Sequence, residues 1–205
     1  VSQGLMLESI SNRLMKKGAA HYGSPDKIPK VRLEMIKQAG ELNIPFTSGI
    51  LIGIGENRLE RVEALLALRE LQEKYGHIQE IIIQNFKAKS GTPMQYHPEP
   101  ELEEVLWTVA IARILFGPEM NIQTPPNLNA DHLEKILDAG INDWGGISPL
   151  TPDHVNPEAP WPELENLSEM MTSLGKCLTE RLAIFPAFTV NHERWVDPKV
   201  LRRLR

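Results

Sequence analysis

Apolar runs in which every residue is hydrophobic constrain the fold of this chain more than any other feature. The segments Ile50–Leu51–Ile52 and Ile81–Ile82–Ile83 lie in runs of strand length. Strands that bury both faces are typical of parallel sheets covered by helices, whereas the strands of a sandwich alternate apolar and polar residues. The sequence therefore favours a barrel or a doubly wound sheet built from β/α units.

The order of strand-like and helix-like segments is regular along the chain. Strands are predicted at Gly4–Glu8, Phe46–Gly53, Gln79–Phe86, Met120–Thr124 and, with a less apolar pattern, Ile141–Ile147. Amphipathic helices are predicted from Pro29 to Leu42, from Arg58 to Tyr75, from Pro100 through Val109, and around Leu133–Leu137. This order predicts an α/β fold, a partial (β/α) barrel whose working end is formed by the carboxyl ends of its strands.

The chain is predicted to be a single domain over residues 1–205. Residues 148–162 contain five prolines, so we expect a long irregular loop there, and the last residues are expected to form a C-terminal extension. Because the sequence begins with Val1 rather than with Met, we expect it to begin part-way along a longer protein.

Composition argues against several classes of function. Acidic residues outnumber basic ones by 27 to 22, the wrong sign for a chain that grips nucleic acid. Because the sequence has no apolar run of about 20 residues and no secretory signal, we expect no membrane partner and a cytoplasmic location. The single cysteine, Cys177, excludes a cysteine-built metal or iron–sulfur site held by this chain alone, and we expect it to be a small buried hydrophobe.

The second predicted strand ends in a segment with three glycines, Gly49, Gly53 and Gly55. Glycines let a ligand lie against the backbone, and the helix that follows offers free N–H groups. The spacing does not complete a dinucleotide-binding fingerprint, because Arg58 stands where the third glycine would be. By spacing alone, a tight turn between strand and helix explains these glycines as well.

The same segment also fits the pattern G-x-I-x-G-x-x-E, with Leu51 in place of the isoleucine. This pattern resembles the fifth strand of radical S-adenosylmethionine (SAM) enzymes, where the apolar residue contacts the adenine. Arg32 precedes it on a helix, in an arrangement similar to the biotin-synthase-like branch, in which such an arginine meets the SAM carboxylate. Glu8 ends the first strand, and the resemblance implies that it accepts hydrogen bonds from the SAM amino group or ribose. A surface acid at a helix start is the alternative for Glu8.

The resemblance therefore places a set of residues at the cofactor. These cofactor-binding candidates are Glu8, Arg32, Gly49, Leu51, Gly53 and Glu56, with Gln84 and Asn85 near the adenosyl group or the substrate. For the two amides, which follow the third strand, a solvated loop is the alternative. His21, beside a loop that is similar to the family's, is a further candidate.

The loop that follows the last predicted strand combines paired glycines, prolines and polar side chains. Asp153 and His154 supply an acceptor and a proton-exchanging ring, which makes them candidate catalytic residues for proton transfer. Adjacent residues can point apart, so their adjacency does not establish a catalytic pair. The candidates for substrate binding are Asn127, Trp144, Gly145, Gly146 and Asn156.

Taken in order with residues 4–9 and 84–94, this loop makes the chain similar to subunit one of the enzymes that form 7,8-didemethyl-8-hydroxy-5-deazariboflavin (FO), the chromophore of the deazaflavin coenzyme. The similarity covers residues 3–190. It implies a radical SAM lyase that closes the third ring of FO from a hydroxybenzyl–ribityliminouracil adduct, with release of ammonia, 5′-deoxyadenosine and methionine. The implied cofactors are SAM and a [4Fe-4S] cluster, and the implied functional partner is FO synthase subunit two, which makes this small-molecule substrate.

One feature departs from the family pattern. Radical SAM enzymes carry a C-x-x-x-C-x-x-C loop after the first strand, and this sequence has no such loop. We therefore expect the chain to be the C-terminal part of a radical SAM core, with the cluster ligands elsewhere, no metal site of its own and no SAM turnover by residues 1–205 alone. Two alternatives remain, a noncatalytic half-barrel scaffold and a different radical SAM enzyme acting on a related substrate.

Overall fold

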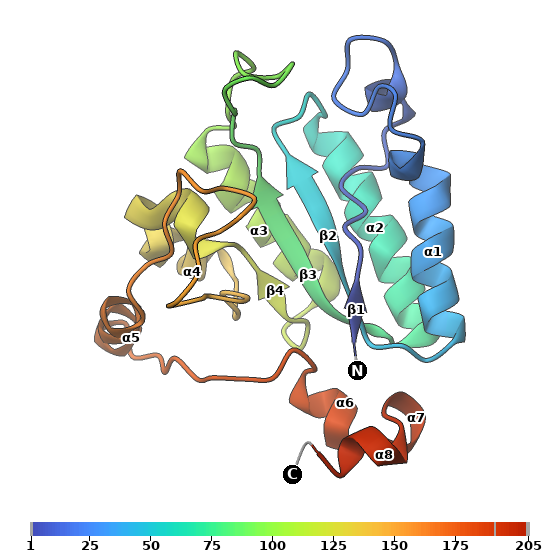
Figure 1. The fold of residues 1–205 in the computed structure, drawn as a ribbon, viewed down its shortest axis with the longest axis vertical. Helices are drawn as coiled ribbons and strands as arrows, with labels where there is room; N and C mark the ends of the chain where they lie inside the picture. Colours follow the sequence, from blue (N-terminus) through green and yellow to red (C-terminus); the bar gives the residue numbers. More distant parts are fainter. Residues whose placement is uncertain (1, 191, 204–205) are drawn as a thin grey trace.

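The computed structural model describes residues 2–190 and 192–203, and a parallel sheet of strand order β1-β2-β3-β4 lies at its centre. The strands are β1 (Gln3–Gly4), β2 (Phe46–Ile52), β3 (Ile78–Asn85) and β4 (Ile122–Gln123). The two long strands pair from Thr47 opposite Glu80 to Ile52 opposite Asn85. All four strands run in one direction, so their carboxyl ends meet at the upper edge in Figure 1.

Helices connect the strands and pack in chain order beside the sheet (Figure 1). They are α1 (Pro29–Glu41), α2 (Arg58–Tyr75), α3 (Leu102–Phe116) and α4 (Leu133–Ala139). Asn57 and Glu60 form a capping box at the start of α2, and Gly76 ends this helix in the left-handed conformation. Sequential strands with sequentially packed helices are compatible with the predicted partial barrel, whereas the strand order of a doubly wound sheet reverses.

Short helical segments complete the chain. The 3₁₀ turns are η1 (Asn12–Met15), η2 (Pro25–Lys27) and η3 (Pro126–His132), and the helices after the proline-rich loop are α5 (Leu164–Ser173), α6 (Pro186–Val190), α7 (His192–Trp195) and α8 (Pro198–Leu201). Helices α6 to α8 lie below the amino ends of the strands in Figure 1. They enclose a small apolar cluster of their own, formed by Ile184, Phe185, Phe188 and Val196.

Several sequence predictions are corrected. The first strand covers only Gln3–Gly4, because Glu8 takes a left-handed backbone (φ 63°) and returns to the sheet through a single bridge to Ile50. The fifth predicted strand is reduced to one bridge between Gln123 and Asp143. Cys177 is exposed, because it lies in an irregular segment after α5 and not on an amphipathic helix.

The main core lies between the sheet and its helices. Its fully buried members include Ile36 of α1, Leu65 and Leu68 of α2, and Ile81 and Ile83 of β3. In the part of the chain that the structure describes, no helix combines the length and the apolar character that crossing a membrane requires.

Candidate functional site at the carboxyl ends of the strands

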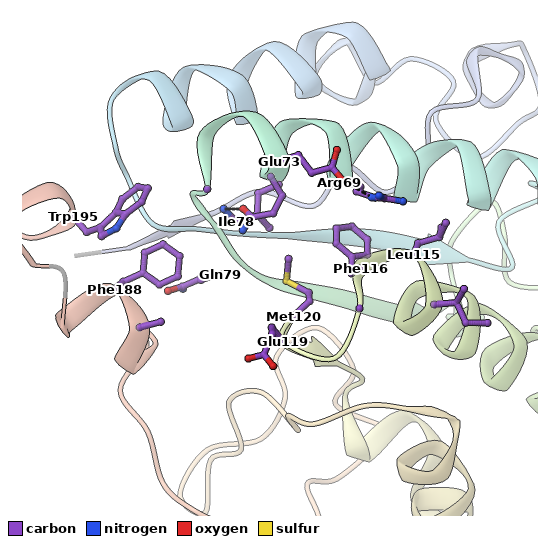
Figure 2. A pocket seen from close by; sticks show the side chains of 15 residues that line it. Arg69, Glu73, Ile78, Gln79, Leu115, Phe116, Glu119, Met120, Phe188 and Trp195 are labelled. Carbon is purple, nitrogen blue, oxygen red and sulfur yellow. Dashed lines mark hydrogen bonds and ion pairs between the residues drawn. The ribbon is translucent and has the colours of Figure 1, made fainter.

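Two cavities lie at opposite ends of the sheet. The cavity in Figure 2, of about 620 Å³, lies at the amino end of β3, between the ends of α2 and α3 and the tail residues Phe188 and Trp195. Its wall combines apolar and polar side chains, and two of the polar ones, Arg69 and Glu73, pair with each other at 2.7 Å. None of the site residues predicted from the sequence belongs to its described wall.

The second cavity, of about 950 Å³, lies at the carboxyl ends of the strands. Leu51 of β2 and Gln84 and Asn85 of β3 form its floor, and Asn156 of the proline-rich loop belongs to its wall. The wall includes aromatic and apolar residues, namely Leu14, Tyr22, Ile54, Phe86, Met94 and Tyr96, and also the charged residues Arg13, Lys87 and Lys89. A concave, mostly apolar pocket with a few convergent polar groups is the usual form of a small-molecule site, so we take this cavity as the candidate functional site.

Beside this cavity, Glu8 collects three basic side chains. Lys27 Nζ lies 2.9 Å from both of its carboxylate oxygens, His21 Nε2 lies 2.9 Å from Oε2, and Arg32 Nη1 lies 3.2 Å from Oε1. Burial raises the pKa of Glu8, but hydrogen bonds from His21 and Lys27 and the charges of Lys27 and Arg32 outweigh it and lower the pKa to about 2. Glu8 is therefore a carboxylate at neutral pH. The loop between Glu8 and α1, which contains η1 and η2, brings His21 and Lys27 to this carboxylate.

Arg32 is 5% exposed and every nitrogen of its guanidinium has a partner. Nε donates to the Asp26 carbonyl at 2.9 Å, Nη1 contacts the Met6 carbonyl and Glu8, and Nη2 donates to the Asp26 carboxylate at 3.3 Å. The Asp26 side chain is 71% exposed, so the partner of Nη2 is the one that faces solvent. A carboxylate can thus reach this guanidinium from outside by replacing Asp26.

At most of the glycines predicted to bind a ligand, other atoms of the protein already occupy the space beside the Cα atom. A Cβ at Gly49 would meet the backbone of Ile82 on the neighbouring strand, and a Cβ at Gly53 would meet the ring of Pro100. At Gly145 (φ +73°) it would meet the side chain of Gln123. The structure therefore explains these three glycines by close packing of protein against protein. Gly55 (φ +103°), by contrast, lies on the cavity wall.

Glu56 closes the turn between β2 and α2. Its carboxylate accepts hydrogen bonds from the N–H groups of Gly53 and Ile54, both at 2.8 Å, and from Arg61 Nε at 2.7 Å. The side chain is 2% exposed and is not among the residues that line the cavity. Trp144 is likewise buried in the main core. These contacts give both residues structural partners within the chain.

The side chains of Asp153 and His154 have different surroundings: Asp153 is hydrogen-bonded to its neighbours, and His154 faces solvent. Asp153 Oδ2 accepts from Asn127 Nδ2 and Asn156 Nδ2, both at 2.9 Å, and Oδ1 accepts from the Val155 N–H at 2.8 Å. Burial raises the pKa of Asp153, but the hydrogen bonds from Asn156 and Asn127 outweigh it and hold the pKa below its ordinary value. His154 is exposed and lies outside the described wall of the cavity.

Amide side chains link the ends of β3 and β4. Asn129 Nδ2 donates to Asn85 Oδ1 at 2.8 Å, and Asn127 Nδ2 also donates to the Ala159 carbonyl at 3.1 Å. Among the described residues, no donor reaches the buried Asn127 Oδ1. The candidate site thus combines the amides of two strand ends with the proline-rich loop.

Comparison with known proteins gives a consistent result, although no family model matches the chain. FO synthase of Mycobacterium tuberculosis is 50% identical over 201 residues, which are 97% of this chain and 24% of that protein. FO synthase of Streptomyces avermitilis is 50% identical over 205 residues, 100% of this chain and 24% of that protein. The 7,8-didemethyl-8-hydroxy-5-deazariboflavin synthase of Methanothermobacter thermautotrophicus is 53% identical over 203 residues, 99% of this chain and 61% of that protein. The chain is a homologue of the FO synthases.

This FO synthase homologue spans about a quarter of the two FO synthases above and 61% of the third relative. Within residues 2–190 and 192–203, no three His, Cys, Asp or Glu side chains are grouped so that they could hold a metal ion.

The sequence alone does not identify some of the charged residues that join distant segments of this FO synthase homologue. Lys27 follows no recognisable motif, whereas Lys89 lies in the polar loop after the two amides, Gln84 and Asn85, that end the third strand. Glu80 carried a clearer signal, because an acid within the apolar run of β3 must be buried. Its partners, Asp143 and Arg181, are distant in the sequence and only the fold reveals them.

Proposed function

We propose that this chain contributes the SAM- and substrate-binding part of a radical SAM lyase that closes the third ring of FO. The observation that carries the proposal is its identity of 50–53%, over 97–100% of its length, with proteins named for FO synthesis. The substrate would be the hydroxybenzyl–ribityliminouracil adduct that subunit two makes, and ammonia, 5′-deoxyadenosine and methionine would leave. The cavity at the carboxyl ends of the strands supports this assignment, since barrel enzymes place their chemistry at this end.

The residues beside the cavity fit the amino-acid end of SAM. Glu8 is a carboxylate that can accept from an ammonium or hydroxyl group, and Arg32 has one nitrogen whose present partner is the exposed Asp26 carboxylate. An acid and a guanidinium 3.2 Å apart match the opposite charges of an α-amino acid. Leu51 offers the cavity an apolar surface on which the adenine can lie.

For the iron–sulfur cluster, in contrast to SAM, no binding residues are proposed within this chain. The described residues supply no ligand set for it, so its thiolates would belong to other parts of the protein. When bound together, SAM and the cluster supply the radical that abstracts hydrogen from the substrate. This chain's own contribution would be to bind and orient: Gln84 and Asn85 at the cavity floor and Asn156 on its wall present amides to the polar substrate, and the aromatic wall excludes water.

The test uses protein expressed from its complete gene, purified and reconstituted with iron and sulfide without oxygen. We expect the protein to cleave SAM and to form FO from the adduct, detected by fluorescence and mass spectrometry. Glu8→Gln should weaken SAM binding and slow FO formation, whereas Glu73→Gln, at the opposite end of the sheet, should not.

Each alternative predicts a different outcome of the same assay. SAM cleavage that never yields FO would indicate another radical SAM enzyme acting on a related substrate. Failure of the reconstituted protein to bind SAM at all would indicate the scaffold.

A further inference from the structure

The loop that follows β3 and the proline-rich loop meet at one ammonium group. Lys89 Nζ contacts the Val155 carbonyl, lies 3.0 Å from Asn156 Oδ1 and lies 3.3 Å from Glu158 Oε1. An ammonium has three N–H donors, so these three acceptors use all of them. All three acceptors belong to residues 155–158, which makes Lys89 a connection between two segments more than 60 positions apart.

On its other side, the proline-rich loop is tied to the end of β4. Asn156 Nδ2 donates to Asp153, and Asp153 also accepts from Asn127, which follows β4. Asn127 holds the loop a second time through the Ala159 carbonyl. Hydrogen bonds therefore run without a break from Lys89, after β3, through the proline-rich loop to Asn127, after β4.

The segment that Lys89 holds belongs to the candidate site. Val155 and Asn156 line the cavity at the carboxyl ends of the strands, and Asn156 is 5% exposed. The same cavity has Gln84 and Asn85 on its floor, so this side of it is rich in amides. Glu8, which follows β1, and Arg32 of α1 belong to the opposite edge of the sheet from β4.

We propose that Lys89 is a positioning residue for the substrate: its ammonium fastens residues 155–158 so that Val155 and Asn156 form the cavity wall against which the uracil and ribityl end rests. This inference depends on the proposed function. Amides pair with the donors and acceptors of a pyrimidine ring or a polyol, and a wall fixed in place lowers the entropy lost on binding. Lys89 itself has no N–H left to donate to the ligand, so it acts through the loop.

The first test measures the loop directly. In protein expressed from the complete gene, Lys89→Met should accelerate hydrogen exchange of the backbone amides of residues 150–158, followed by mass spectrometry. Lys37→Met is the matched control, because it removes an ion pair with Glu34 on α1, away from the cavity. Lys89→Arg keeps several donors and should stay close to the wild type. Equal exchange in all variants would overturn the inference.

The second test separates positioning of the substrate from a general loss of structure. Lys89→Met should raise KM for the adduct about tenfold while KM for SAM stays unchanged, because Glu8 and Arg32, the charged residues proposed for SAM, lie near β1 and contact neither Lys89 nor residues 155–158. Glu158→Gln, which removes the negative charge of one of the three acceptors but keeps its oxygen, should give a smaller effect in the same direction. Unchanged KM for the adduct, or an equal rise in both KM values, would overturn the inference. A wild-type protein that makes no FO would instead overturn the proposed function on which the inference depends.

Discussion

Arg181 Nη2 lies 2.9 Å from Glu80 Oε1, and this contact joins residues 101 positions apart. The same guanidinium binds Asp143 through Nε at 2.5 Å and through Nη2 at 2.8 Å. Its carbon lies 3.9 Å from the centre of the Phe185 ring. One cation of the C-terminal segment thus sits between two carboxylates on the sheet, and this arrangement fastens the tail to β3.

Glu80 should make the stability of the protein depend on pH near neutrality. Burial, followed by the charge of Asp143, raises the pKa of Glu80 from 4.5 to about 7. Because the folded state holds this proton more tightly than the unfolded chain does, its contribution is complete below pH 4.5 and is lost as the pH rises through 7. The free energy of unfolding should fall by on the order of 2–3 kcal/mol over this range.

Urea unfolding at several pH values between 4.5 and 8 checks this prediction. Glu80→Gln should remove the fall, so that the variant gains stability relative to the wild type as the pH rises. Glu73→Gln, which changes a largely exposed acid, should keep the wild-type slope. Parallel slopes for the wild type and Glu80→Gln would mean that Glu80 is ionised throughout.

Glu8 should act in the opposite direction and at lower pH. Its pKa is lowered to about 2 in the folded state, so its contribution is complete above pH 4.5 and is lost as the pH falls through 2. Glu8→Gln should lower the free energy of unfolding at pH 7 by on the order of 2 kcal/mol, and the difference from the wild type should shrink in acid. Glu34→Gln, on the exposed side of α1, serves as the control in the same denaturant titration.

Asp153 and His154 should differ in their effect on FO formation. The Asp153 carboxylate accepts three hydrogen bonds that orient Asn127, Asn156 and the Val155 amide, and an asparagine at this position would present an N–H to at least one of these donors. Asp153→Asn should therefore slow FO formation by about tenfold or more. His154 is exposed, so His154→Gln should leave the rate within about twofold of the wild type. Steady-state rates of FO formation by the reconstituted variants test both expectations. A large loss of rate in His154→Gln would show that this histidine takes part in the reaction.

Local signals explain which parts of the fold were predictable. The bounds of α2 agree with the prediction at both ends, because Asn57 and Gly76 cap the helix and its apolar face repeats at helical spacing. The apolar runs of β2 and β3 were equally clear. The first strand was predicted too long, because nothing in a single sequence shows that a glutamate such as Glu8 takes a positive φ.

The site was less predictable because its contacts are long-range. Glycine marks a close approach, but the sequence does not say whether a ligand or protein approaches: at Gly49 it is the neighbouring strand and at Gly53 it is Pro100. Likewise, the acceptors of the Lys89 ammonium lie 66 to 69 positions away in the sequence, where no local pattern points to them. The sequence indicates the chemical character of these residues, whereas their contact partners become known only from the folded structure.

The adjacent glycines Gly145 and Gly146 offer a matched pair that separates packing from substrate contact. A Cβ at Gly145 would require a left-handed alanine and would meet the Gln123 side chain, so Gly145→Ala should lower the free energy of unfolding by about 2 kcal/mol. No described atom lies within 4 Å of a Cβ at Gly146, so Gly146→Ala should stay within about 0.5 kcal/mol of the wild type. Thermal and urea unfolding measure both variants. Because Gly146→Ala keeps its stability, its KM for the adduct then tests the proposed substrate contact alone: an increase supports the contact, and a wild-type KM removes Gly146 from the substrate site.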